Sequence, residues 1–228
     1  MESMVSKNFW NKKKVLITGH TGFKGSWLSY LLNFYGADLY GISLPKYKND
    51  KTSLIELKSL DIKSYYFDIC NSKKLQKVMN EIKPEIIFHL AAQSLVLESY
   101  KDPKKTFDTN INGTANILFS SSVTDNVKTI INITTDKVYK NRNQNKSFKE
   151  DDELGGSDPY SASKACADIM SQSIMQLPSI NNLSICNVRA GNVIGGGDWS
   201  KHRLVPDIVK SYKNGKNLPI RNPSSVRP

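Results

Sequence analysis

Short apolar runs alternate with amphipathic stretches along this chain of 228 residues, and the alternation predicts strands that alternate with helices. Residues 15–18 are typical of a buried strand. The next stretch, 23–35, has apolar residues at helical spacing and stops before Gly36, a residue type that ends many helices. The same patterns predict further strands at 39–42, 65–69, 85–90, 129–133 and 183–188, and further helices at 75–82, 107–123 and 159–177.

A strand followed by a helix and another strand forms a right-handed crossover, so these strands are expected to run parallel in a sheet covered on both faces. We therefore expect an α/β fold with a Rossmann-like, doubly wound parallel sheet in residues 1–189. Residues 190–228 begin with a glycine-rich stretch and predict one helix (204–212) and the start of one strand (218–220). We expect them to begin a substrate-binding region that stays incomplete.

The chain carries 32 Lys and Arg against 21 Asp and Glu, a formal net charge of +11. The lysines are spread along it rather than gathered in one basic stretch, so we expect no nucleic-acid partner and a field that favours a small anion such as a nucleotide. No apolar run approaches the ~20 residues of a membrane span, and no secretory signal opens the chain, so we expect no membrane partner. Scattered cysteines and histidines, three of each, predict free thiols, a cytoplasmic location and no metal site.

A glycine motif lies between the first predicted strand and the first predicted helix, where a dinucleotide-binding fold binds phosphates. Glycines at 19, 22 and 25 permit a tight turn, approach of a pyrophosphate to the backbone, and close helix–strand packing at a helix N-terminus. The end of the second strand, 41–46, lacks the acidic residue that binds a ribose 2′-hydroxyl, so the residues alone leave NADP open beside NAD. Within the motif, cofactor contacts are assigned to Gly19, Thr21, Gly22, Phe23 and Gly25.

Tyr160 and Lys164 stand four residues apart in a predicted helix, so they lie on one face, one turn apart. A free tyrosine has a pKa of about 10 and is no base at neutral pH. A neighbouring ammonium and a positive nicotinamide ring would lower that pKa. Such a pair is common by chance, but together with the glycine motif and Thr135 after the fifth predicted strand it is a strong indication of a catalytic site.

The glycine spacing and the Tyr160–Lys164 pair resemble the extended short-chain dehydrogenase/reductase superfamily. The resemblance implies that Thr135 shares a hydrogen bond with the substrate hydroxyl that is oxidised. Besides Tyr160 and Lys164, it implies cofactor contacts for Asp68, Ile69, Leu90, Ala91, Ala92 and Asn110.

Asp136 and Lys137 follow Thr135 directly, where nucleotide-sugar 4,6-dehydratases carry an acid/base pair and the epimerases of the superfamily carry none. Asp followed by Lys is similar to the CDP-glucose 4,6-dehydratases. This resemblance implies an NAD-dependent lyase, a homodimer, that converts CDP-glucose into CDP-4-keto-6-deoxyglucose for deoxysugar and O-antigen biosynthesis. Four further segments are similar to that family: 19–28, 188–199, 203–207 and 220–223. Substrate contacts are assigned to Gln93, Asn192, Arg203 and Arg221, the arginines as bidentate partners of a diphosphate.

Two other functions remain open. A nucleotide-sugar 4-epimerase shares Thr135, Tyr160 and Lys164 but has no use for Asp136 and Lys137. A non-catalytic dinucleotide-binding fragment is favoured by the short chain and disfavoured by the intact catalytic set. Since the resembling family continues beyond the last residue here, we expect weak or absent turnover from the 228 residues alone.

Overall fold

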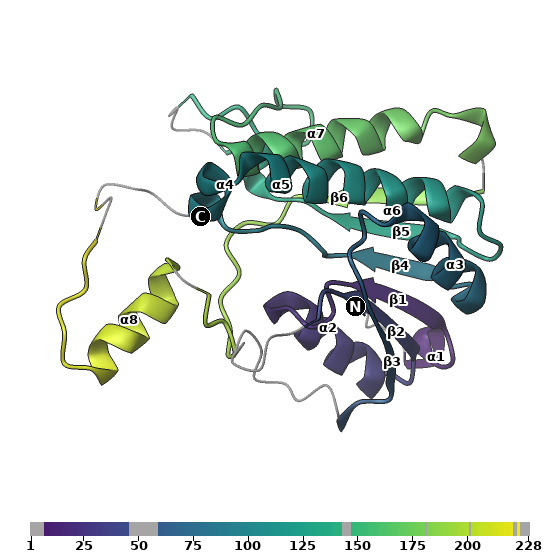
Figure 1. Cartoon of the computed structure of the whole chain (residues 1–228), viewed down its shortest axis with the longest axis horizontal. Helices are drawn as coiled ribbons and strands as arrows, with labels where there is room; N and C mark the ends of the chain where they lie inside the picture. The colour runs from purple at the N-terminus through teal and green to yellow at the C-terminus, as the bar shows by residue number, and fades with distance from the viewer. Residues whose placement is uncertain are drawn as a thin grey trace.

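A computed structural model of the chain describes residues 7–45, 59–142, 147–180, 182–200, 202–220 and 223. Its six strands pair in parallel as one sheet, in the order β3-β2-β1-β4-β5-β6 (Figure 1). The strands are β1 (Lys14–Thr18), β2 (Asp38–Ser43), β3 (Ile62–Tyr66), β4 (Ile86–His89), β5 (Thr129–Ile133) and β6 (Ser184–Val188). The sheet extends from β1 first in one direction and then in the other, so the predicted Rossmann-like, doubly wound sheet is confirmed.

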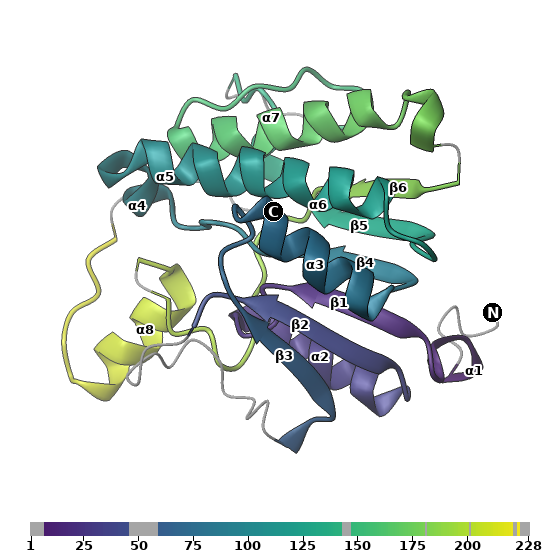
Figure 2. The same cartoon turned by 45° about the vertical axis from the view of Figure 1, so that its right-hand side comes forward.

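Helices lie on both faces of the sheet (Figures 1 and 2). The side chains of β1 divide between the faces, as period-two alternation requires. Leu16 packs in a core cluster with residues of α3, α6 and α7, whereas Val15 and Ile17 pack with Leu32 of α2. All three β1 residues are fully buried, and this double burial explains the unbroken apolar run in the sequence. The helices concerned are α2 (Phe23–Phe34), α3 (Ser72–Ile82), α6 (Gly113–Ser122) and α7 (Pro159–Ile174).

The third strand is not where the sequence pattern predicts it. The strand covers Ile62–Tyr66 rather than 65–69, because its partner β2 ends at Ser43, which pairs with Tyr66. Phe67 and Ile69 are buried, and their apolar character misled the prediction, but they lie in the turn that follows. Asp68 and Ile69 therefore lie beyond the strand end, not within it.

The long helix predicted over 107–123 begins earlier and is not uniform. Asp102 caps α5 (Pro103–Phe107), a π-helical turn follows at Asp108–Asn112, and α6 continues to Ser122. Asp102 followed by Pro103 is a signal for the start of a helix, and the spacing of apolar residues alone does not reveal it. The helix predicted over 159–177 ends at Ile174.

The described part of the chain contains four further short elements and one more helix. Residues 216–220 form no strand, so the strand predicted at 218–220 is wrong. The helix predicted over 204–212 is confirmed as α8, which stands apart from the sheet in both views (Figures 1 and 2). Within the described ranges, none of the helices is long and apolar enough for a membrane crossing. The elements are α1 (Lys7–Trp10), α4 (Val96–Lys101), α8 (Leu204–Lys213), and 3₁₀ turns at Asp136–Val138 and Pro178–Ile180, besides α5.

Candidate active site

Around the turn after β1, the backbone is packed too tightly for a side chain at Gly19 or Gly25. Gly19 has a φ of +74°, and its amide donates to the Ile42 carbonyl at 2.7 Å. A Cβ at Gly19 would lie 2.9 Å from the Ala91 amide nitrogen, and a Cβ at Gly25 would lie 2.2 Å from the Gly19 carbonyl oxygen. The turn, the start of α2 and the segment after β4 therefore meet backbone to backbone.

The N-terminus of α2 has no side-chain cap. Its N-cap residue, Gly22, makes no side-chain hydrogen bond, so the first amides of the helix stay available for an anion. The backbone amide of Thr21 donates to Ser43 Oγ at 3.3 Å, and this hydrogen bond fixes Thr21 next to the end of β2. Phe23 and Lys24 line a cavity of about 490 Å³ together with Trp27 and residues 193–196.

A buried histidine fixes the end of β4, from which Leu90, Ala91 and Ala92 follow. The Thr114 hydroxyl donates to the Asn110 carbonyl at 2.7 Å, so it accepts from His89 Nε2 at 3.0 Å. His89 Nδ1 then accepts from the Thr18 hydroxyl at 2.7 Å. Burial lowers the pKa of His89 to about 3, and the charge of Lys164 acts in the same direction. This histidine is neutral and structural at neutral pH.

Asn110 joins the segment after β4 to the catalytic helix. It lies in the π-helical turn, fully buried, and its side chain exchanges two hydrogen bonds with the backbone of Gln93. It also donates to Ser163 Oγ at 2.8 Å, and Ser163 donates to the Tyr160 carbonyl. The side-chain amide of Gln93 forms hydrogen bonds with the backbone of Leu95 and with the Thr106 hydroxyl. The substrate role assigned to Gln93 stays a prediction.

Thr135 and Tyr160 are brought together, as the sequence predicts for a catalytic set. Asp158 caps α7 by accepting from the Ser161 amide at 2.9 Å, which places Tyr160 in the first turn of the helix. Burial raises the pKa of Tyr160, and the hydrogen bond with Thr135 and the charge of Arg203 offset only part of this effect. The lowered pKa predicted for this phenol is therefore not produced by the protein's own groups, and desolvation is the physical reason.

Lys164 is buried and donates to the Ile133 carbonyl at 2.8 Å. Burial and the charge of Lys24 lower its pKa to about 8, against the opposing effect of Asp168. Lys24 has a lowered pKa as well, through burial and then the charge of Arg203. Three cations from α2, α7 and the N-cap of α8 thus converge on one site.

The Asp136–Lys137 pair forms a 3₁₀ turn directly after Thr135. The Thr135 hydroxyl donates to Asp136 Oδ1 at 3.0 Å and accepts weakly from the Lys137 amide at 3.4 Å. Both side chains are half-buried, and among the described residues the Lys137 ammonium has no hydrogen-bond or ion-pair partner. The turn therefore holds a carboxyl group beside the Thr–Tyr pair and leaves an amine free to act.

The remaining residues predicted to bind substrate or cofactor do not lie together. Arg203 is the N-cap of α8 and donates to Asp198 at 3.1 Å, close enough to Tyr160 and Lys24 to affect their pKa values. Asp68 is exposed and accepts from the Cys70 amide, and Asn192 is exposed in the segment after β6. Arg221 lies outside the described residues. Within the part of the chain that the structure describes, no group of three or more His, Cys, Asp or Glu side chains is arranged to hold a metal ion.

Lys24 is the site residue that the sequence reasoning missed. It stands inside the glycine motif, as the second residue of the helix whose N-terminus forms the predicted phosphate site. This place in the motif is the only sequence signal that could have indicated a role for it. Its distance in sequence from Lys164 and Arg203 hid the cluster that the fold assembles.

The doubly wound sheet, the glycine turn and the Thr–Tyr–Lys set define a dinucleotide-binding protein of the short-chain dehydrogenase/reductase class. Comparison with known proteins gives the particular family. The family model described as GDP-mannose 4,6 dehydratase matches residues 16–225, and the chain belongs to this family.

The proteins similar to the chain include nucleotide-sugar dehydratases and an epimerase. The chain is 44% identical to a CDP-glucose 4,6-dehydratase of Salmonella typhimurium, across 99% of the chain and 64% of that protein. A UDP-glucose 4-epimerase of Mycoplasma genitalium is 26% identical across 88% of the chain and 60% of its own length. The solved structure of a dTDP-glucose 4,6-dehydratase from Bacillus anthracis in complex with NAD has a TM-score of 0.76 and 25% identity, and the match covers 91% of the chain and 63% of that protein. The chain thus spans less than two thirds of the length of these relatives.

Proposed function

We propose that the chain is the cofactor-binding and catalytic part of an NAD-dependent CDP-glucose 4,6-dehydratase, a lyase that converts CDP-glucose into CDP-4-keto-6-deoxyglucose. The observation that carries the proposal is the Asp136–Lys137 turn beside the hydrogen-bonded Thr135–Tyr160 pair, in a chain 44% identical to one such enzyme. An epimerase needs no acid/base pair at this position. In this proposal residues 1–189 bind the cofactor and 190–228 begin the substrate domain.

The glycine turn fits the pyrophosphate of NAD. Any Cβ at Gly19 or Gly25 would overlap backbone atoms, and Gly22 leaves the first amides of α2 uncapped. The NAD bound in the Bacillus anthracis relative supports NAD over NADP. The chemistry that bound NAD would supply is reversible hydride transfer: a hydride is taken up from sugar carbon 4 and later returned to carbon 6. The proposed holding residues are Gly19, Thr21, Gly22, Phe23, Gly25, Asp68, Ile69, Leu90, Ala91, Ala92, Asn110, Tyr160 and Lys164.

The side chains of the site then handle protons. Tyr160 removes the proton of the sugar 4-hydroxyl, to which Thr135 hydrogen-bonds. The 4-keto group that forms acidifies the proton on carbon 5, and Lys137 removes it. Asp136 donates a proton to the leaving 6-hydroxyl, and water departs. Lys137 then returns the proton to carbon 5 as carbon 6 takes up the hydride. Lys24, Arg203 and the proposed partners Asn192 and Arg221 favour the substrate's diphosphate through charge and hydrogen bonds.

Product analysis of the full-length protein with CDP-glucose and NAD tests the proposal. A dehydratase yields a product lighter than the substrate by one water, whereas an epimerase yields an isomer of equal mass. A non-catalytic dinucleotide-binding protein yields neither, although it still binds NAD. We expect the Lys137→Ala variant to oxidise carbon 4 and to stall before elimination; an unchanged rate of product formation would remove Lys137 from the scheme.

We also propose that the protein is a cytoplasmic homodimer that supplies deoxysugars for lipopolysaccharide. Half-exposed apolar side chains on α6 and α7, Phe119 at 51% and Ile169 at 52%, support a helix-to-helix interface. The free thiols of Cys166 and Cys186, both exposed, support a reducing compartment. Light scattering should give twice the monomer mass, and Phe119→Glu with Ile169→Glu should halve it.

A further inference from the structure

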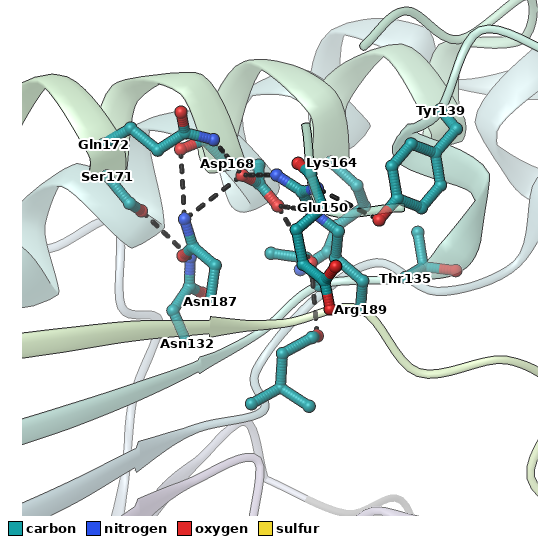
Figure 3. A network of polar contacts seen from close by, with 12 residues as sticks. Asn132, Thr135, Tyr139, Glu150, Lys164, Asp168, Ser171, Gln172, Asn187 and Arg189 are labelled. Carbon is teal, nitrogen blue, oxygen red and sulfur yellow. Dashed lines mark hydrogen bonds and ion pairs between the residues drawn. The ribbon is translucent and has the colours of Figure 1, made fainter. Parts of the chain in front are cut away.

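A buried ion pair lies beside the catalytic face of α7, and the proposed proton transfers do not use it (Figure 3). Asp168 of α7 is fully buried and Arg189, directly after β6, is nearly so. Arg189 Nε donates to Asp168 Oδ2 and its Nη2 donates to Oδ1, both at 2.9 Å. This bidentate geometry is the strongest that the two side chains can form.

The carboxylate of Asp168 is satisfied by further donors. Gln172 donates to Oδ1 at 2.7 Å, and the hydroxyl of Thr134 lies 3.2 Å from Oδ2. Burial by itself would raise the pKa of Asp168, but the hydrogen bonds from Arg189 and Gln172 outweigh burial and hold the pKa below its ordinary value. The pair is therefore charged throughout the range in which the enzyme would work.

Arg189 also binds two other segments. Its Nη1 donates to the Tyr139 hydroxyl at 3.1 Å and to the Glu150 carbonyl at 2.7 Å. The Tyr139 ring lies 5.0 Å from the guanidinium carbon and stacks on Phe148 at 4.7 Å. One guanidinium thus connects α7, the turn after β5 and the loop that follows this turn (Figure 3).

These segments carry the groups of the proposed reaction. Tyr160, Lys164 and Asp168 follow one another at spacings of four residues, so they form one stripe along α7. The 3₁₀ turn with Asp136 starts between Thr134, which contacts Asp168, and Tyr139, which contacts Arg189. The ion pair therefore contacts both sides of this turn and the helix that carries Tyr160.

We propose that Asp168 and Arg189 are a positioning pair, which holds the Thr135–Lys137 turn at a fixed distance from Tyr160. The Asp168 carboxylate also faces the ammonium of Lys164, one turn away on α7, and favours its charged form. The inference rests on the proposed function for its kinetic consequences only. The charge on Lys164 can be measured without any turnover.

The charges around Lys164 determine in which direction its pKa should change when the Asp168 charge is lost. Lys24 of α2 and His89 of β4 face it from other elements, and Tyr160 and Asp168 lie one turn away on α7. Of these, Asp168 is the anion that raises the pKa of Lys164, whereas burial and Lys24 lower it to about 8. Loss of the Asp168 charge should therefore lower the fraction of Lys164 that is protonated at neutral pH.

Asp168→Asn, which keeps the shape and removes the charge, is the first test. The pKa of Lys164 is read from its ¹⁵Nζ chemical shift in a pH titration of the protein without nucleotide, and we expect it to fall by about one unit. With saturating NAD, kcat should fall about tenfold while the KM for CDP-glucose changes less than about twofold, because the residues assigned to substrate binding are untouched. An unchanged Lys164 pKa together with an unchanged kcat overturns the inference.

Tyr139→Phe keeps every charge and deletes only the hydroxyl that accepts from Arg189, so it separates geometry from charge. We expect the Lys164 pKa to stay as in the wild type and kcat to fall about threefold at constant KM. Glu153→Gln is the matched control, since Glu153 lies in the same loop and makes only exposed ion pairs, with Lys140 and Arg142.

The two variants keep the inference separate from the proposed function. If Asp168→Asn fails to fold, Tyr139→Phe decides, and a kcat equal to that of Glu153→Gln overturns the positioning role. If the wild type shows no turnover, the proposed function fails. The Lys164 titration of Asp168→Asn then still supports the pair by a lowered pKa or overturns it by an unchanged one.

Discussion

At the scale of single residues, the glycine turn is the part of the site in which sequence and geometry agree most closely. Its three glycines are spaced as a phosphate-binding turn requires, and the structure explains two of them by backbone overlap. A Cβ at Gly25 would meet Gly19 at 2.2 Å, whereas a Cβ at Gly22 would reach the same carbonyl at 3.3 Å. The two positions therefore tolerate a methyl group to different degrees.

Gly25→Ala should lower the free energy of unfolding by about 1–3 kcal/mol, because the start of α2 must move away from the turn. Gly22→Ala is the matched substitution and should cost less, since its contact needs a shift of only a few tenths of an ångström. Urea unfolding of both variants measures the difference. Equal losses would contradict the close packing described for Gly25.

His89 makes stability depend on pH. Its pKa is about 3 in the folded protein against an ordinary value of 6.5, so below pH 6.5 the unfolded chain binds a proton that the folded protein refuses. The free energy of unfolding should therefore fall as pH falls, by about 1.4 kcal/mol per pH unit between pH 6 and 5. His89→Gln should show a flatter dependence over this interval in urea titrations. A parallel dependence in both proteins would argue against a neutral buried His89.

The residues that the sequence could not predict are those whose role depends on distant neighbours. Lys24 and Arg203 are 179 positions apart in the numbering, and only the fold brings their charges together. Tyr160 and Lys164 were predictable because one helix carries both. The pKa of Tyr160 was not, because it depends on burial, which the pattern of a single helix does not reveal.

At the scale of elements, α7 carries most of the chemistry, and its first turn depends on one cap. Asp158 accepts from the Ser161 amide at 2.9 Å and from the Ser161 hydroxyl at 2.6 Å. Asn71 caps α3 in a similar way, accepting from the Lys74 amide at 3.0 Å. The two caps are similar in kind, but only that of α7 adjoins Tyr160, the proposed base.

Asp158→Ala should lower the free energy of unfolding by about 1 kcal/mol and also reduce kcat, because fraying of α7 displaces Tyr160. Asn71→Ala should cost a similar amount of stability and leave kcat unchanged. Steady-state kinetics and thermal unfolding of the pair measure both effects. A kcat loss of the same size in Asn71→Ala would mean that α7 capping has no special role.

Elements with a clear start signal and strong periodicity were predictable, and the misplaced ones have physical reasons. β5 has the predicted bounds because an apolar run meets polar ends on both sides. β3 was shifted because buried turn residues, Phe67 and Ile69, are as apolar as strand residues. The π-helical turn that positions Asn110 leaves no trace in apolar spacing.

At the scale of the whole molecule, alternating strands and helices were enough to predict the sheet, because handedness leaves few topologies. The position of the segment that leads from β6 to α8 was not predictable, since it depends on a contact distant in sequence: the Trp27 indole donates to the Gly196 carbonyl at 2.8 Å. The net charge of +11 is also a property of the whole molecule, and it favours the binding of anions.

Binding of a nucleoside diphosphate should weaken with salt, because the positive field and the convergent cations attract it. Calorimetric titration with CDP should give a dissociation constant that rises severalfold between low and high sodium chloride. Cytidine, which carries no phosphate, is the control and should bind with little dependence on salt. Equal salt dependence of both ligands would contradict an electrostatic contribution to binding.

The most direct test of the central claim follows one hydrogen atom. The full-length protein is supplied with NAD and CDP-glucose deuterated at carbon 4, and the product is examined by NMR spectroscopy. A 4,6-dehydratase moves the deuterium to carbon 6 of a 4-keto-6-deoxy sugar, which is the result we predict. Deuterium that remains on carbon 4 of an epimerised sugar, or label that is found nowhere but in unreacted substrate, would contradict the proposed function.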